Sequence, residues 1–285
     1  MARIFSTINL KGGVGKTTTT VALAETFSAE FGKKVLVIDL DPQTNATTML
    51  IGEEKWRKLN EDEHTLARLF KDALNPDDKR FDFDATLQKR VSDVTGARNV
   101  DLLPSSLDLI DIQDQLATTP SGKFYSVNPI ELLWRAVKAR LDDYDIVIVD
   151  CPPNLGIITL NGLRISEGYI IPTIPDILST YGIPQIVTRV GEFADEIGEP
   201  IDPLGVVVSK YKANSTVHAN VLRDLKSRSD APVFETNIPE ANDIAAAAEH
   251  QTYNRTLKQK YGYRGLAESY RSLAHEILKK LEDQQ

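Results

Sequence analysis

The sequence predicts an α/β fold in which a mostly parallel, twisted sheet is doubly wound, with helices on both faces. Short runs rich in Val, Ile and Leu alternate with amphipathic helical stretches along most of the 285 residues, an alternation typical of such folds. The runs are apolar almost throughout, as expected of parallel strands that helices cover on both sides. With 41% hydrophobic and 26% charged residues, the chain has the composition of a soluble globular protein with a full core.

Seven segments have the character of buried strands. They cover residues 3–10, 33–40, 99–106, 144–151, 167–174, 203–210 and 231–238. Two of the helices between them have clear boundaries. The first spans residues 15–31 and is followed by Gly32, a suitable C-cap. The second spans residues 128–141, with Asn128 as N-cap and Pro129 at the first helical position.

Residues 51–98 interrupt this rhythm because they are heavily charged and contain one clear helical pattern, around residues 64–74. We expect a surface excursion between two core strands; the alternative is an element that docks a partner or flanks a dimer interface. No repeat or low-complexity tract divides the chain, so we expect residues 1–285 to form a single domain. The last segment should form a helix that packs on the core through an apolar stripe of Leu273, Ile277, Leu278 and Leu281.

Charge and cysteine content exclude several classes of protein. The net charge of −8 argues against a protein that coats nucleic acid with its whole surface, although a local basic patch remains compatible with it. Cys151 is the only cysteine, which excludes an internal disulfide and a multi-cysteine metal site, and we expect it to be a small buried residue. The sequence shows neither a signal-peptide pattern nor an apolar run long enough to span a bilayer, so we expect a cytoplasmic protein.

A glycine-rich loop, "NLKGGVGKTTTT" at residues 9–20, follows the first predicted strand and opens the first helix. In that context glycines bring backbone N–H groups toward phosphate oxygens, and the helix adds its positive end. We expect Lys16 to neutralise the β- and γ-phosphates, Thr17 to ligate Mg²⁺ and Thr18 to reach the α-phosphate. The predicted phosphate site comprises Gly12, Gly13, Val14, Gly15, Lys16, Thr17 and Thr18. The loop departs from the Walker A pattern because Leu10 replaces its first glycine, and it carries a second lysine, Lys11.

Three aspartates follow predicted core strands. Asp39 and Asp41 lie in "VIDLD" and share one face of the strand, and Asp150 ends "DIVIVD". In an open α/β sheet the carboxyl ends of the strands form the ligand edge, so these carboxylates should face the phosphate loop. One carboxylate can hold a water of Mg²⁺ and another can orient the attacking water. The sequence therefore predicts a site for a nucleotide and magnesium.

At these residues the sequence resembles the ParA/MinD family of deviant Walker A ATPases. The resemblance is carried by "KGGVGKTT", "DLDPQTNAT", "DCPPNLGIITLNGL", "IPTIPDILSTYGI" and "NIPE". It implies slow, partner-stimulated ATP hydrolysis with Mg²⁺ in a nucleotide-sandwich dimer. It also implies that Lys11 reaches the partner subunit's nucleotide, that Asp41 activates water, and that Asp39 and Asp150 are outer ligands of Mg²⁺. The implied adenine pocket comprises Ser209, Lys210, Ile238 and Pro239.

Relatives that share this loop differ in what they bind. Nitrogenase-type reductases need cysteines that this chain lacks, and MinD-like proteins end in a basic membrane-binding helix, whereas this chain finishes "EDQQ". The alternatives that remain are a MinD-like membrane-associated ATPase and a metabolic ATP-dependent ligase. We favour a ParA-like ATPase that binds nucleoid DNA without sequence preference and positions a plasmid, a chromosome origin or a protein microcompartment with a small adaptor protein.

The DNA-binding residues are expected among basic residues of the last third of the chain. The candidates are Lys210, Lys212, Arg223, Lys226, Arg228, Arg255, Lys258, Lys260 and Arg264.

Overall fold

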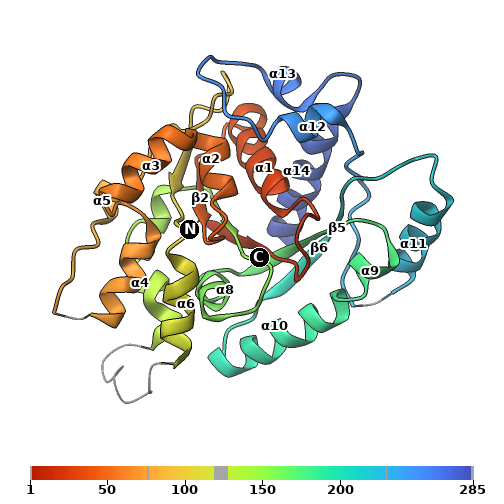
Figure 1. The fold of residues 1–285 in the computed structure, drawn as a ribbon. Helices are drawn as coiled ribbons and strands as arrows, with labels where there is room; N and C mark the ends of the chain where they lie inside the picture. Colours follow the sequence, from red (N-terminus) through yellow and green to blue (C-terminus); the bar gives the residue numbers. More distant parts are fainter. Residues whose placement is uncertain (1, 76, 119–127, 229, 284–285) are drawn as a thin grey trace.

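The computed structural model of the protein describes residues 2–75, 77–118, 128–228 and 230–283. Six strands form one parallel sheet with the order β3-β2-β4-β1-β5-β6 (Figure 1). Their bounds are β1 Arg3–Thr7, β2 Val35–Asp39, β3 Val100–Leu103, β4 Ile146–Asp150, β5 Gly168–Thr173 and β6 Asp202–Val208. The predicted parallel sheet is therefore confirmed.

Helices cover both faces of the sheet, because alternate residues of each strand point to opposite sides. In β2, Val35 and Val37 belong to one apolar cluster, and Leu36 and Ile38 belong to the other. The first cluster is covered by α1 (Lys16–Phe31), α2 (Asn45–Ile51), α3 (Glu53–Glu61), α13 (Leu257–Tyr261) and α14 (Leu266–Asp283). The second is covered by α4 (Leu66–Leu74), α6 (Leu109–Thr118), α7 (Leu132–Val137), α8 (Ile157–Arg164), α10 (Ile183–Ile197) and α11 (Thr216–Ser227).

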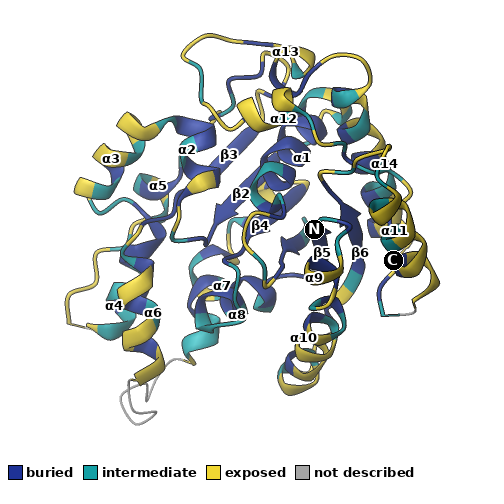
Figure 2. Cartoon of the chain, turned by 45° about the vertical axis from the view of Figure 1, so that its right-hand side comes forward, coloured by how far each residue is buried: buried dark blue, intermediate teal, exposed yellow. Residues whose placement is uncertain are grey.

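Three short helices complete this description, namely α5 (Phe83–Thr86), α9 (Ile177–Thr180) and α12 (Asn242–Ala246). Figure 2 shows the strands buried between the two helical layers, whose outer faces are exposed.

The predicted seventh strand is wrong. Residues 231–238 run beside β6 without forming a continuous ladder: they make an isolated bridge between Val206 and Val233, and a separate bond from the Ile238 N–H to the Val208 carbonyl at 2.8 Å. The amides of Val206 and Phe234 make the two bonds of this bridge, to the carbonyls of Pro232 and Val206 at 2.7 and 3.1 Å. Pro232 has no N–H to donate, so the ladder cannot extend through it.

The helix predicted over residues 128–141 is broken into two 3₁₀ turns (Pro129–Glu131 and Leu141–Asp143) and the six-residue α7 between them. The side chain of Asn161, from α8, causes the first break. Its Oδ1 accepts the Leu133 N–H at 3.0 Å, and its amide donates to the Pro129 carbonyl at 2.9 Å. These two groups would bond to each other in a continuous helix, so the inserted side chain opens the ladder. The predicted cap is present, because Asn128 Oδ1 accepts the Ile130 N–H.

Residues 51–98 connect β2 to β3 and contribute to both cores. Leu59, Val91 and Val94 lie in one apolar cluster, and Leu66, Phe70 and Leu87 lie in the other. The predicted helix around residues 64–74 is α4. The segment is more deeply integrated than a surface excursion, because its charged residues alternate with buried apolar ones.

Helix α14 packs against α1, as predicted. Leu273, Ile277 and Leu281 are fully buried in the same cluster as Phe27 of α1, and Leu278 is half-buried against it. The apolar stripe of this helix therefore faces the core. Across the described ranges, no helix combines the length and the hydropathy needed to cross a bilayer.

Candidate active site

The phosphate loop joins β1, in the middle of the sheet, to the N-terminus of α1. Gly13 and Gly15 have φ angles of 75° and 84°, in the left-handed region that favours glycine. Ser209, at the end of β6, fixes the loop from the other side. Its hydroxyl donates to the Val14 carbonyl at 2.6 Å, and its Oγ would lie 3.5 Å from a Cβ at Gly15. The loop is thus fixed between the end of β1 and the end of β6, in a conformation in which its N–H groups can bind a chain of phosphates.

Two adjoining cavities meet at this loop. A cavity of about 260 Å³ lies beside Lys16, Thr17, Thr18 and Asp41, and a second cavity of about 520 Å³ lies beside α12. Gly15, Thr18 and Lys210 line both cavities. The two cavities together form a continuous site. The smaller cavity is suited to the phosphates, and the larger cavity, which has both polar and apolar lining residues, is suited to a base.

The two lysines of the loop point to different places. Lys16 is buried, lines the smaller cavity, and donates from Nζ to the Lys11 carbonyl at 3.2 Å. Lys11 does not line that cavity. Its Nζ lies 3.3 Å from Ser179 Oγ and 3.9 Å from Asp176 Oδ1, on the segment that forms α9. Only Lys16 therefore faces the chain's own phosphate cavity.

Asp39 and Asp150 are register partners on neighbouring strands β2 and β4, and both are fully buried. Burial, reinforced by the negative charge of Asp150, raises the pKa of Asp39 well above its usual range. Burial also raises the pKa of Asp150 to about 7, and the hydroxyls of Thr17 and Thr20 oppose that rise. Two neighbouring buried carboxylates can both be ionised only if a cation compensates their negative charge.

The oxygens of these two aspartates differ in what they can still accept. Asp39 Oδ2 accepts the Thr47 N–H and hydroxyl at 2.9 and 2.6 Å, and its Oδ1 accepts the Asp41 N–H at 3.1 Å. Asp150 Oδ1 accepts the Thr20 hydroxyl at 3.1 Å, but its buried Oδ2 has no hydrogen-bond partner in the described structure. An unsatisfied buried carboxylate oxygen beside Thr17 fits a magnesium-bound water.

The described residues contain no group of three or more His, Cys, Asp or Glu side chains that could enclose a metal by itself. A cation here would therefore take its direct ligands from Thr17 and from the nucleotide phosphates. Asp150 would contact it through a water.

Asp41 is buried and lines the phosphate cavity. Its Oδ1 accepts the Gln43 N–H at 2.9 Å, which fixes the carboxylate, while Oδ2 has no bond to any described residue. Burial raises the pKa of Asp41, and the charge of Lys16 opposes this rise. A fixed, raised-pKa carboxylate with one free oxygen is suited to accept a proton from water.

The four residues of the predicted adenine pocket all line the larger cavity. Sequence reasoning missed other parts of its wall. They come from the two residues before α12, from α12 itself and from α14, and include Glu240, Ala241, Asn242, Ile244 and Tyr270. The "NIPE" motif ends at Glu240, one residue before Ala241, the N-cap of α12, so its position could have indicated this wall. Sequence reasoning also missed Gln43, Asn45, Thr48 and Met49, which line the phosphate cavity just after Asp41.

Cys151 is buried at the end of β4, and burial raises the pKa of its thiol, which suits the structural role expected of it.

The predicted DNA-binding residues do not form one surface. Arg255 and Lys260 are buried in ion pairs with Asp93, and Lys260 also pairs with Glu25 at 2.7 Å. Their side chains cannot reach DNA, so the prediction for these two residues is wrong. Lys210 donates to the Gly13 carbonyl at 2.7 Å, which assigns it to the phosphate loop.

The other candidates are more exposed, but most have partners. Lys212, Lys226, Arg228 and Lys258 form ion pairs with Glu240, Glu235, Asp230 and Glu268. Arg223 and Arg264 have no ion pair with a described residue. Three of these side chains, Arg223, Lys226 and Arg228, belong to α11 or its C-cap, an exposed helix with only Leu225 buried.

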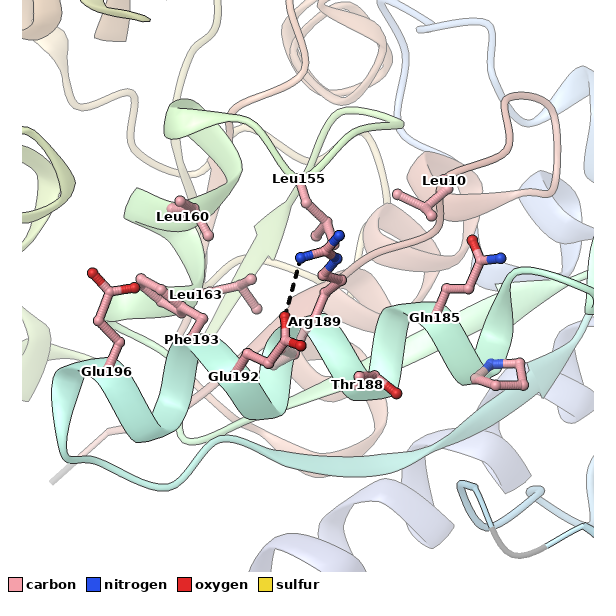
Figure 3. A pocket seen from close by; sticks show the side chains of 12 residues that line it. Leu10, Leu155, Leu160, Leu163, Gln185, Thr188, Arg189, Glu192, Phe193 and Glu196 are labelled. Carbon is pink, nitrogen blue, oxygen red and sulfur yellow. Dashed lines mark hydrogen bonds and ion pairs between the residues drawn. The ribbon is translucent and has the colours of Figure 1, made fainter.

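A third cavity, of about 960 Å³, forms a groove beside the phosphate loop. Figure 3 shows side chains of α8 and α10 facing each other across it, with Leu10 at one end and the Arg189–Glu192 pair on its rim. Leu155, Leu163 and Phe193 supply much of its apolar lining. The groove thus connects an apolar surface directly to the residue that precedes Lys11.

The fold and the loop geometry define a nucleotide-binding protein of the P-loop class. Residues 2–202 match a family model described as an AAA domain. The chain is 30% identical over 277 residues to the chromosome-partitioning ATPase Soj of Thermus thermophilus, covering 96% of this chain and 95% of that protein. It is also 30% identical over 250 residues to the sporulation initiation inhibitor protein Soj of Bacillus subtilis, covering 88% and 89%. The chain belongs to the ParA/Soj family of deviant Walker A ATPases.

Solved structures show the same fold with nucleotide in place. The cobyrinic acid a,c-diamide synthase of Mycobacterium smegmatis, with a bound ATP analogue and magnesium, is 26% identical with a TM-score of 0.73. The match covers all of this chain and 98% of the synthase.

Proposed function

We propose that this protein is a ParA-type ATPase that binds Mg·ATP, forms a nucleotide-sandwich dimer and hydrolyses ATP slowly until a partner stimulates it. In the ATP-bound dimer it binds nucleoid DNA without sequence preference. Its cycle positions or segregates a cargo, which is a plasmid, a chromosome origin or a protein microcompartment, through a small adaptor protein. In this proposal the protein is cytoplasmic and associates with the nucleoid.

The position of Lys11 is the observation that carries this proposal. A lysine that served its own nucleotide would line the phosphate cavity beside Lys16, but Lys11 lies outside that cavity with its amine at Asp176 and Ser179. Its side chain is 43% exposed, so it is available to a second subunit. One loop thus carries a lysine for each of two nucleotides.

The surface around Lys11 supports dimerisation as well. Leu10 is 37% exposed, and Ile177, Leu178 and Tyr181 are 71%, 75% and 72% exposed on the segment that holds the Lys11 amine. Large apolar side chains gathered at one place on a surface are typical of an interface. A second subunit that covered them would also bring its nucleotide to Lys11.

We assign a chemical role to each side chain on the basis of its position in the site. Lys16 and the loop N–H groups hold the phosphates and stabilise the charge that develops on the γ-phosphoryl group. Asp41 positions the attacking water and takes its proton through the free Oδ2. Magnesium, when bound with ATP, would neutralise negative charge on the phosphates, and Thr17, Asp150 and Asp39 would hold it and its waters. Asp39 also fixes the loop that carries Asp41.

Within this proposal, DNA binding is assigned to α11 and its C-cap because three exposed basic side chains, Arg223, Lys226 and Arg228, lie close together there, and Arg223 has no ion pair with a described residue. Phosphate contacts of this kind give salt-sensitive, sequence-independent binding. The MinD-like alternative needs a free amphipathic helix, and α14 has its apolar stripe in the core. The ligase alternative has support from the fold of the M. smegmatis synthase.

The decisive experiment is the Lys11→Ala variant, compared by light scattering with wild type in a non-hydrolysable ATP analogue. We expect the variant to bind Mg·ATP as a monomer with little loss, yet to fail in dimerisation and hydrolysis. Facing nucleotides bring many negative charges together, and loss of one partner of a buried charge pair costs ~3–5 kcal/mol. Lys58→Ala, which removes an exposed lysine of α3, is the matched control. Normal dimerisation of Lys11→Ala would contradict the role in the partner subunit, and a wild type that stays monomeric with ATP would favour a ligase.

A further inference from the structure

A fourth cavity, of about 400 Å³, is polar and lies away from the nucleotide site. Most of its lining comes from Arg90, Ser92, Thr95, Arg98, Asn99 and Asn254. None of these residues lines either nucleotide cavity. The cavity therefore needs an explanation of its own.

Two chain segments that are far apart in sequence form this cavity and are fixed to each other. The Arg255 N–H donates to the Asp93 carbonyl, and the Thr95 N–H donates to the Arg255 carbonyl, both at 2.9 Å. Beneath them, the carboxylate of Asp93 pairs with Arg255 and Lys260 at 2.8 Å. Because its two walls are joined by backbone bonds and buried ion pairs, the cavity is pre-formed.

The guanidinium groups of Arg90 and Arg98 are unusual in this protein. Of its fifteen arginines, all in the described ranges, eleven form ion pairs. The four without an ion pair to a described residue are Arg90, Arg98, Arg223 and Arg264, and two of these four share this one cavity. No acidic side chain is among its lining residues, although the chain contains 41 Asp and Glu residues.

Most of the neutral polar side chains that line the cavity are free to form further hydrogen bonds. The Ser92 hydroxyl is already engaged, since it donates to Glu25 at 2.7 Å. The Thr95 hydroxyl and the side-chain amides of Asn99 and Asn254 have no bond to a described residue, and each can donate to an anion. The Arg90 N–H donates to Asp101, which fixes the backbone from which one guanidinium extends.

We propose that this cavity binds a phosphate group. Arginine forks match phosphate oxygens in a bidentate manner, and hydroxyl and amide donors complete such a site. No aromatic side chain lines the cavity to stack on a base, so the recognised part is the phosphate itself. The phosphate belongs either to a free phosphorylated molecule or to a nucleic-acid backbone.

The test is a calorimetric titration in which inorganic phosphate is added to the protein. The protein is first saturated with Mg²⁺ and a non-hydrolysable ATP analogue, so that the added phosphate cannot bind at the phosphate loop. Ionic strength is held constant with sodium chloride. The test variant carries Arg90→Gln and Arg98→Gln together. The control is Arg57→Gln, which removes an exposed arginine of α3 that is paired with Glu53. Thermal unfolding checks that all variants are folded.

We expect one saturable site in wild type and control, and a loss of affinity of about tenfold or more in the double variant, because both charge-assisted contacts are gone. Unchanged affinity in the folded double variant, or no saturable binding by wild type, overturns the proposal. A labelled DNA duplex then identifies the source. If the double variant loses affinity for both phosphate and duplex, the site binds a nucleic-acid backbone. If it loses affinity for phosphate alone, the site binds a free phosphorylated molecule.

Discussion

Lys11 Nζ lies 3.9 Å from Asp176 Oδ1, so the lysine that we assign to the partner's nucleotide is held by its own chain in the absence of a partner. Asp176 also accepts the Ser179 N–H and hydroxyl at 2.8 and 2.7 Å, which caps α9 and fixes the carboxylate. Both side chains of the pair are about 40% exposed, at 43% and 39%. Solvent weakens a pair of this kind, and a nucleotide on a second subunit can replace Asp176 as its acceptor.

The first prediction concerns Asp176→Asn. Asparagine keeps the N-cap of α9 but releases Lys11 from a negative charge, so stability should change by less than about 1 kcal/mol. With an ATP analogue, the variant should dimerise at a lower protein concentration than wild type. Chromatography with light scattering over a dilution series measures this midpoint. Weaker dimerisation would show that Asp176 supports the interface directly.

The second prediction concerns Asp41→Asn. The amide can keep the bond from the Gln43 N–H but cannot accept a proton, so ATP should bind normally while hydrolysis slows by about 10²-fold or more. Nucleotide titration and single-turnover phosphate release separate the two effects. Asp142→Asn, an exposed aspartate remote from the site, is the control. If the Asp41→Asn turnover equals that of wild type, another group activates the water.

The third prediction concerns pH. Burial holds the pKa values of Asp39 and Asp150 above their ordinary value, at about 7 for Asp150, so the fold favours their protonated forms. Their contribution to stability is present at low pH and is lost as the pH rises through the folded pKa. The thermal midpoint of metal-free protein should therefore fall from about pH 6 to about pH 8, and less so in Asp150→Asn.

Adding Mg·ADP should raise that midpoint more at the higher pH, because the cation compensates the ionised carboxylates. A pH response identical in wild type and Asp150→Asn would remove Asp150 as its source.

The fourth prediction concerns DNA. Replacement of Arg223, Lys226 and Arg228 by glutamate should weaken binding to duplexes of any sequence and reduce the slope of log K against log salt. Nucleotide affinity should stay unchanged. Fluorescence anisotropy with an ATP analogue measures both effects. The control variant carries glutamate in place of Lys55, Arg57 and Lys58 on α3, which changes the net charge by the same amount. If the control loses as much affinity for DNA as the α11 variant, the loss reflects the overall charge of the protein and α11 is not the DNA-binding site.

Features that depend on neighbours in sequence were predictable. The phosphate loop needs glycines at fixed spacing between a strand and a helix, and Gly13 and Gly15 adopt the left-handed φ values that this spacing implies. Asp39 and Asp150 end their strands as expected, and the parallel pairing of those strands brings them together.

Features that depend on distant residues were not predictable. Lys260 looks like a surface charge in its own segment, but Glu25 and Asp93, 235 and 167 residues away, supply the carboxylates that bury it. Asn161 likewise breaks a helix whose own sequence favours continuity. In both cases side chains from distant parts of the chain outweigh the local preference, and the sequence alone does not show that they meet.

The central place of β1 in the sheet has a consequence for synthesis on the ribosome. β1 leaves the ribosome first among the strands, yet its two neighbours, β4 and β5, begin at residues 146 and 168. Until β4 has emerged, the strand that supports the phosphate loop has no neighbour to pair with, and until β5 has emerged, one of its edges stays open. A nascent chain that has not yet reached Thr173 lacks part of the sheet around the phosphate loop, so we expect it to bind nucleotide only late in translation.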